Sequence, residues 1–391
     1  MNVKRVILIV LDSVGIGFLP DATLYGDHGS NTLGHISEKI KEFYIPNLIN
    51  MGLGNIDPTN LLLKSSAPIA AFGKAAERSA GKDTTTGHWE IAGTILKNPF
   101  PTFPNGFPEG FINAFEKVIG TRTIGNYSSS GTVIINQLGD EHIKTGYPIV
   151  YTSADSVFQV AMHEDVIDLN RQYEICQIAR DLLVGEYEVG RVIARPFNGK
   201  SGIYSRTSGR KDFATTPPDN LLTSIMANKM AVVGIGKISD IFAGKGINRS
   251  IKTSNNTEGI KATIHAISED INGLIFTNLV DFDMHFGHRR DVEGYAKCLE
   301  DFDTYIPELL KAIHDDDLLV ITADHGNDPT WKGTDHTREY IPILMYGKSV
   351  LSGGNIGTRN SFADIAATIA EVLGIDFDTE GVSFIDKVMK E

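Results

Sequence analysis

The sequence predicts an α/β fold: a doubly wound, mostly parallel sheet with helices on both faces, interrupted by a smaller inserted α+β domain. The first observation is a set of short runs rich in Val, Ile and Leu that do not alternate with polar residues. Such runs are typical of strands buried on both faces of a parallel sheet. The second is that helical patterns lie between these runs. The predicted strands are residues 5–13, 230–236, 273–283, 317–326 and 340–347, and the clearest helices are 293–313 and 361–374.

The middle of the chain has a different composition, which predicts an inserted domain. It opens with a stretch rich in Pro, Phe and Gly, NPFPTFPNGFPEGF, and then carries its own strand and helix patterns. The segment TTPPDN, around Pro217, indicates the return to the first domain. We therefore expect a core made of residues 1–97 and 214–391, with an inserted cap domain of residues 98–213.

Composition and charge exclude several classes of protein. The formal charge of −13 over 391 residues argues against a nucleic-acid partner, because such surfaces need clustered positive charge. The two cysteines, Cys176 and Cys298, are too few for a disulfide framework. The N-terminal apolar run stops at Asp12 without a cleavage site, and no run reaches the roughly 18 residues that a membrane span needs. We expect a cytoplasmic protein that does not enter a membrane.

Carboxylates follow three of the predicted strands. Asp12 ends the first run, Asp281 and Asp283 follow the third, and Asp324 with His325 follows the fourth. In open α/β sheets the functional crevice lies beyond the carboxyl ends of the strands. A single Asp at such a place is often only a helix cap or a turn former. Several acids collected at one edge are costly to bury in ionised form unless a cation compensates them.

Histidines near these carboxylates extend the pattern to a metal site. Three of them, His288, His325 and His336, supply neutral imidazole donors. Three Asp with three His suit two divalent ions of the Mn, Zn or Fe type. Two such ions about 3.5–4 Å apart would clamp the attacking and leaving oxygens of a phosphoryl group. Within NLVDFDMHFGHRR, spacing alone does not decide between Asp281 with His285 and Asp283 with His288.

The segment SAGKDTTTGHWEIAG carries three consecutive threonines between Asp83 and Gly87. They could merely cap the helix that begins there, since Thr and Asp both accept hydrogen bonds from free N–H groups. Alternatively, a hydroxyl at a helix N-terminus beside two metal ions is a nucleophile, and the helix dipole stabilises its phosphoryl adduct. The neighbouring metal pattern favours the nucleophile.

Four motifs together resemble the phosphopentomutases, a family of the alkaline phosphatase superfamily: LDSVGIG, GKDTTTGHWE, NLVDFDMHFGHRR and TADHGNDPTWKGTDHTREY. The resemblance extends over nearly the whole chain and includes YTSADSVFQVAMHE, GRVIARPF and GKISDIF. It implies an alkaline phosphatase-like core that binds two Mn²⁺, with other divalent metals as alternatives, and a cap inserted after the nucleophile segment. The implied metal ligands are Asp12, Asp283, His288, Asp324, His325 and His336, which leaves Asp281 and His285 as supports.

The resemblance also implies a reaction. Members interconvert ribose 1-phosphate or 2-deoxyribose 1-phosphate with the 5-phosphate through a phosphothreonine and a 1,5-bisphosphate. The phosphorylated residue would be Thr84, primed by a sugar bisphosphate activator, with Thr85 the weaker candidate. The implied substrate contacts are Ser153, Asp155, Arg195, Arg206 and Lys237. We expect a monomeric isomerase whose partner is a small-molecule sugar phosphate.

Other functions remain open at this point. A metal-dependent phosphatase, a phosphodiesterase or a phosphoglycerate mutase could use the same core. A sulfatase is disfavoured, because its nucleophile needs a Cys/Ser-x-Pro-x-Arg context that KDTTTGHW does not supply. A binding module with structural metal is also disfavoured, because such sites usually take their ligands from one compact motif, whereas Asp12 and His336 lie near opposite ends of the chain.

Overall fold

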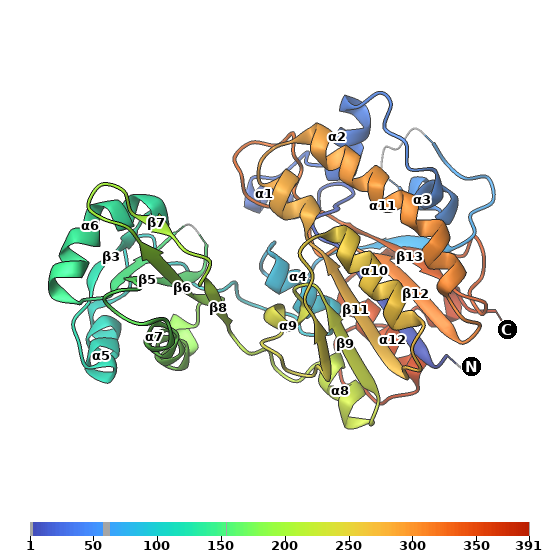
Figure 1. Ribbon diagram of the computed structural model, residues 1–391. Helices are drawn as coiled ribbons and strands as arrows, with labels where there is room; N and C mark the ends of the chain where they lie inside the picture. The colour runs from blue at the N-terminus through green and yellow to red at the C-terminus, as the bar shows by residue number, and fades with distance from the viewer. Residues whose placement is uncertain (1–2, 58–62, 154, 391) are drawn as a thin grey trace. The chain divides into compact units, whose positions relative to one another are not determined.

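The computed structural model describes residues 3–57, 63–153 and 155–390. The chain divides into two compact units. The larger unit comprises Met1–Asn98 and Pro217–Glu391, and the smaller unit is the continuous segment Pro99–Thr216 (Figure 1). The smaller unit occupies the region in which the sequence predicts a cap domain.

The larger unit is built on one mostly parallel sheet. In spatial order its strands are β10 (Arg249–Ile251), β9 (Ala231–Ile235), β11 (Gly273–Leu279), β1 (Arg5–Leu11), β12 (Asp317–Thr322), β13 (Ile341–Tyr346), β2 (Ala71–Ala75) and β14 (Asn355–Arg359). Among these strands only β13 runs against the others, pairing antiparallel with both β12 and β2. The predicted α/β class with a mostly parallel sheet is confirmed.

The three central strands end side by side. β1 pairs in parallel with β11 on one side, with Leu11 opposite Leu279, and with β12 on the other, with Val10 opposite Thr322. All three strands are buried along their whole length, which explains why their sequences are apolar without alternation. The residues that follow them therefore lie along one edge of the sheet.

Helices cover the sheet of the larger unit. One set packs together and contains α2 (Thr32–Lys39), α3 (Pro46–Met51), α10 (Asn256–Ile267) and α11 (Val292–Ala312). Figure 1 shows α10 and α11 crossing in front of the sheet. The second set contains α4 (Thr84–Ile91), α8 (Leu221–Ala227), α9 (Ile238–Ile241) and α12 (Ala363–Leu373). A four-residue helix, α1 (Ala22–Tyr25), follows the first strand.

The predicted strand 273–283 was too long. β11 ends at Leu279, and residues Phe282–Gly287 form a short π-helix. The backbone leaves the sheet where Asp281 makes a reciprocal pair with α10: its carboxylate accepts the Asn256 N–H at 2.7 Å, and its own N–H donates to the Asn256 side chain at 3.0 Å. This pair ends the strand before the acidic residues.

The smaller unit contains a second sheet with helices on both faces. Its strands are β3 (Ile124–Ser128), β4 (Ile149–Thr152), β5 (Val157–His163), β6 (Arg191–Asn198), β7 (Ser205–Arg206) and β8 (Lys211–Ala214). Its helices are α5 (Glu109–Ile119), α6 (Gly131–Thr145) and α7 (Leu169–Leu182). Phe111, Phe115 and Phe158 belong to an aromatic core beneath α5 and α7. Tyr151 and Phe197 belong to a separate core beneath α6.

The described residues contain no helix that is both long and apolar enough to pass through a membrane.

Candidate metal and nucleophile site

The first cluster lies at the edge where β1 and β12 end. Asp12, Asp324 and His325 each place one donor atom within 4.8 Å of the others. The Nε2 atom of His325 is 3.4 Å from Asp12 Oδ1 and 3.3 Å from Asp324 Oδ2. All three residues are buried. Two carboxylates and an imidazole thus converge inside the larger unit.

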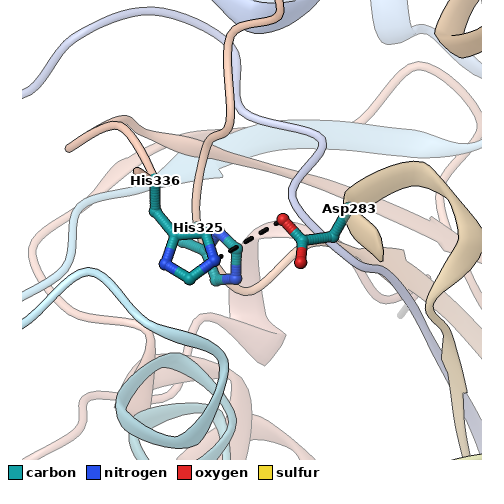
Figure 2. A group of neighbouring side chains, drawn as sticks. All are labelled: Asp283, His325 and His336. Carbon is teal, nitrogen blue, oxygen red and sulfur yellow. Dashed lines mark ion pairs between the residues drawn. The ribbon is translucent and has the colours of Figure 1, made fainter. Parts of the chain in front are cut away.

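The second cluster adjoins the first through His325. Asp283, on the π-helix, lies within 4.8 Å of donor atoms of His325 and His336. Figure 2 shows the two imidazoles beside each other and facing the carboxylate, with His336 Nε2 at 3.5 Å from Asp283 Oδ1. His288 completes the group: its Nε2 is 3.1 Å from Asp283 Oδ2 and 3.1 Å from His336 Nε2. All six predicted ligands are therefore brought together.

The donor atoms of these clusters fit a pair of bound cations. The buried atoms Asp12 Oδ1 and Asp324 Oδ2 accept no hydrogen bond of normal geometry from the described residues. An orphaned carboxylate oxygen is costly in a protein interior. In the second cluster the Nε2 atoms of His288 and His336 face each other at 3.1 Å, and the Asp283 carboxylate lies beside both. A divalent ion would satisfy oxygen and nitrogen lone pairs of this kind at once.

Backbone carbonyls orient two of the imidazoles. The Nδ1–H of His288 donates to the Thr334 carbonyl at 2.7 Å, and that of His325 donates to the Gly326 carbonyl at 3.0 Å. Each bond fixes the tautomer and leaves Nε2 as the free donor atom toward the clusters. Metal-binding histidines in proteins are commonly oriented in this way.

The charges in the first cluster act strongly on one another. Burial raises the pKa of Asp12, and the nearby Asp324 carboxylate raises it further. Burial lowers the pKa of His325, but Asp324 and Asp12 more than offset this and hold its pKa well above the ordinary value. Without a cation, the two carboxylates thus favour the protonated, positively charged form of His325.

In the threonine segment, one residue caps the helix and another lies beside the donor clusters. Asp83 is the N-cap of α4, and its Oδ1 accepts the N–H groups of Thr85 at 3.0 Å and Thr86 at 3.1 Å. Thr86 directs its hydroxyl back to Asp83 at 2.6 Å. Thr84, the first residue of the helix, instead places its Oγ1 3.2 Å from His325 Nε2. Because Asp83 caps the helix, the Thr84 hydroxyl is free to lie beside His325, which belongs to both donor clusters.

Three neighbouring residues were missed by the sequence reasoning. The Nδ2 group of Asn278 donates to Asp12 at 2.8 Å, and that of Asn327 donates to Asp283 at 2.7 Å. His88 Nδ1 lies 3.0 Å from Asp324 Oδ2. Asn278 sits within β11, and His88 within the helix that carries the motif TTTGHW, so neither follows the strand-end pattern.

Asp281 and His285 lie apart from the donor atoms. The carboxylate of Asp281 is committed to the N-terminus of α10 through Asn256. His285 is half exposed and only 3.9 Å from Asp281, with no contact to either cluster among those described. Among the described contacts, neither residue reaches a donor cluster.

The predicted substrate contacts are divided between the units. Ser153 and Asp155 follow β4 of the smaller unit, and Asp155 is exposed. Arg195, on β6, donates from Nε to Gln159 at 3.1 Å, while Arg206 lies on β7 and is exposed. Lys237 belongs to the larger unit, where it is exposed directly before α9.

The chain resembles known proteins over almost its full length. The Metalloenzyme superfamily description matches residues 4–377. The phosphopentomutase of Acetivibrio thermocellus is 56% identical over 387 residues, which cover 99% of this chain and all of that protein. The phosphopentomutase of Carboxydothermus hydrogenoformans is 54% identical over 374 residues, covering 95% of this chain and 96% of that protein.

Two solved structures have a fold similar to that of this chain. The PH0037 protein from Pyrococcus horikoshii has a TM-score of 0.50 at 13% identity, covering 97% of this chain and all of that one. A phosphoglycerate mutase from Leishmania mexicana has a TM-score of 0.50 at 11% identity, covering all of this chain and 98% of that one. At such identities the likeness is one of architecture alone.

Proposed function

The chain belongs to the phosphopentomutase family and is therefore an isomerase that moves a phosphoryl group within a sugar phosphate, and from this premise we propose its mechanism. The proposed substrates are ribose 1-phosphate and 2-deoxyribose 1-phosphate, which become the 5-phosphates through a 1,5-bisphosphate. The proposal rests on family membership together with the position of the Thr84 hydroxyl, whose oxygen lies 3.2 Å from His325 Nε2. A cytoplasmic monomer remains our prediction.

We propose that the chain uses two Mn²⁺ ions, with other divalent metals as alternatives. Membership of a metalloenzyme superfamily and the two donor clusters support divalent metal use. The proposed ligands are Asp12, Asp283, His288, Asp324, His325 and His336. When bound, such ions lower the pKa of a coordinated hydroxyl and stabilise charge on phosphoryl oxygens.

Thr84 is the proposed carrier of the phosphoryl group: its Oγ1 is the leaving group of the first half-reaction and the nucleophile of the second. Phospho-Thr84 gives its phosphoryl group to the free sugar hydroxyl; the bond from Thr84 Oγ1 to phosphorus breaks, and the proton lost by the sugar hydroxyl passes to Thr84 Oγ1. The 1,5-bisphosphate then turns, and Thr84 Oγ1 takes the other phosphoryl group while its proton passes to the sugar oxygen whose bond to phosphorus breaks. The dipole of α4 would assist, because Thr84 is the first residue of this helix. A sugar bisphosphate would supply the first phosphoryl group.

The smaller unit is proposed to hold the remainder of the substrate. Arg195 and Arg206 suit the phosphate that is not reacting, since a guanidinium can bind two of its oxygens at once. Ser153 and Asp155 suit the sugar hydroxyls. Lys237 would add a positive charge from the larger unit. Keeping water away from phospho-Thr84 would separate a mutase from a phosphatase.

One assay tests the proposed function. Purified protein with Mn²⁺ and ribose 1-phosphate should form ribose 5-phosphate without releasing inorganic phosphate. Stoichiometric phosphate release would support a phosphatase instead. Turnover of 3-phosphoglycerate in place of the pentose phosphate would support a phosphoglycerate mutase.

A further inference from the structure

Arg290 lies just after the π-helix and has an uncommon backbone conformation. Its φ is 56°, in the left-handed region that residues with a side chain rarely adopt. Such a conformation persists only where the surrounding structure holds it, and it is often found at functional sites. Arg290 is half-buried and follows His288 by two residues. Its side chain is therefore placed to act on the second cluster.

The guanidinium of this arginine binds two distant parts of the chain at once. Nη1 donates to the Gly287 carbonyl, at the end of the π-helix, at 2.9 Å, and to the Asp328 carbonyl at 3.1 Å. Nε donates to the Gly333 carbonyl and Nη2 to the Asp335 carbonyl, each at 2.7 Å. One side chain thus ties the π-helix to both ends of residues 328–335, called the 328–335 loop below.

This loop orients two of the proposed ligands. Gly333 and Asp335 flank Thr334, whose carbonyl accepts the Nδ1–H of His288 at 2.7 Å. His336 directly follows Asp335. By holding the carbonyls on both sides of Thr334, the guanidinium fixes the peptide that orients the ring of His288. It also fixes the backbone from which His336 extends.

A third proposed ligand is reached through Asn327. Nη1 of Arg290 donates to Oδ1 of Asn327, and Nδ2 of Asn327 donates to Asp283 Oδ1 at 2.7 Å. A guanidinium has donors only, so it must face the carbonyl oxygen of the amide. The NH₂ group of the amide is thereby turned towards the Asp283 carboxylate.

We propose that Arg290 is the positioning residue of the second cluster. It acts on Asp283 through Asn327, and on His288 and His336 through the 328–335 loop. None of its described hydrogen bonds reaches the first cluster. The inference rests on the proposed function and deepens it, because one side chain would then set the affinity of one ion without binding that ion.

Arg290→Lys is the primary test, because it keeps the positive charge while a single ammonium cannot reproduce the planar set of donors. Mn²⁺ binding is measured by electron paramagnetic resonance of the free ion. The Kd of one of the two ions should rise about tenfold or more, as it does when an outer partner of a metal ligand is lost. The Kd of the other ion should stay the same. Two unchanged Kd values, or two that rise by the same factor, would overturn the proposal.

Hydrogen exchange in the metal-free chain gives a readout that needs neither metal nor substrate. Amides of residues 328–337 should lose protection in Arg290→Lys, because the loop is no longer tied to the π-helix. Amides of β12 should keep theirs. Loss of protection throughout the larger unit would indicate general destabilisation and would contradict a positioning role.

Turnover separates positioning from catalysis. The Mn²⁺ concentration that gives half-maximal activity should rise in Arg290→Lys by the same factor as the Kd. At saturating Mn²⁺, kcat for ribose 1-phosphate should recover to most of the value of the unchanged chain. A kcat that stays low at saturating Mn²⁺ would overturn a role confined to positioning.

Two further variants control for charge and backbone. Arg289→Lys, at the exposed neighbouring position, should change neither the Kd values nor the exchange. Arg290→Gly allows the left-handed backbone without strain, so it should weaken the same ion as Arg290→Lys only if the guanidinium matters. Full affinity in Arg290→Gly would overturn the proposal. The expected Kd shift in a protein that fails to isomerise pentose phosphates would refute the proposed function and keep the positioning role.

Discussion

Thr84 and Thr85 are adjacent in sequence but their hydroxyls have different surroundings. Only Thr84 places its oxygen beside His325, at 3.2 Å. Thr84→Ala should therefore lower the rate of pentose phosphate interconversion by about 1,000-fold or more, as removal of a nucleophile does. Thr85→Ala, the matched control, should retain most of the activity. Coupled assays on both purified variants make the comparison.

The Thr84→Ala variant should also keep its fold and metal content, because Asp83, not Thr84, caps the helix. Circular dichroism and elemental analysis verify this. Activity in Thr84→Ala equal to that of Thr85→Ala would remove Thr84 from the mechanism.

Asp281 and Asp283 form a second pair of close neighbours with different contacts. Asp283 faces His288 and His336, whereas Asp281 is committed to Asn256. Asp283→Asn should weaken binding of one metal ion by about 100-fold or more. Asp281→Asn should keep two ions per chain. Metal titration with inductively coupled plasma analysis measures both, and equal metal loss in the two variants would contradict the assignment.

Sequence alone could not separate these two aspartates, and the structure shows why. Both stand in one short segment in which strand and helix spacing bring either residue close to a histidine. Asp283 lies on the π-helix and faces His288 and His336, whereas the Asp281 carboxylate, just before the π-helix, contacts Asn256. Asn278 and Asn327 were missed for a related reason. Each contacts an aspartate that is distant in sequence, Asp12 and Asp283 respectively, and only the tertiary fold brings these pairs together.

Strands were the elements that the sequence predicted best. β1, β11 and β12 are buried on both faces, and this burial requires apolar runs in the sequence. The parallel register of β1 and β12 then places Asp12 and Asp324 close together. The end of β11 was wrong because hydrophobicity continues past Leu279, whereas a polar contact stops the strand. The roles of the six proposed ligands stay predictions that metal analysis must test.

One histidine links two elements of the smaller unit and makes their stability depend on pH. In α6, His142 donates from Nδ1 to the Tyr147 carbonyl at 2.7 Å, and its Nε2 accepts the His163 N–H, at the end of β5, at 2.9 Å. Burial lowers the pKa of His142 below its ordinary value of 6.5, and His163 lowers it further. The neutral ring is therefore the form that the folded unit requires.

Protection of α6 and β5 amides from hydrogen exchange should accordingly decrease as pH falls. A pKa depressed in the folded state gives stability that is present above 6.5, the unfolded value, and is lost as pH falls towards the folded pKa. Exchange measured by mass spectrometry between pH 7.5 and 5.5, corrected for intrinsic rates, tests this. His142→Gln should reduce protection at pH 7.5 and flatten its pH dependence, while the exposed His265→Gln should change neither. A pH dependence unaltered in His142→Gln would contradict the role.

At the scale of the whole molecule, the two units should respond differently to metal removal. Both tryptophans of the chain, Trp89 and Trp331, belong to the larger unit, so their fluorescence reports that unit alone. A chelator should lower the melting temperature seen by tryptophan fluorescence by roughly 5–10 °C, because bound metal stabilises only the folded state. The same chelator should leave amide protection in α6 unchanged.

Asp283→Asn provides the control for this effect. Since the variant is expected to lose most of the metal affinity of one cluster, the chelator should lower its melting temperature by less than that of the unchanged chain. An equal shift in both proteins would mean that the chelator does not act through the Asp283 cluster.

The order of the chain has a consequence for biosynthesis. The smaller unit is one continuous segment, Pro99–Thr216, so it can fold while the ribosome is still translating the rest. β1 must wait, because its two partners in the sheet, β11 and β12, are translated long after it. The proposed metal site would thus be complete only after His336 has left the ribosomal tunnel, and a truncated nascent chain that ends before this residue would lack one of the six proposed ligands.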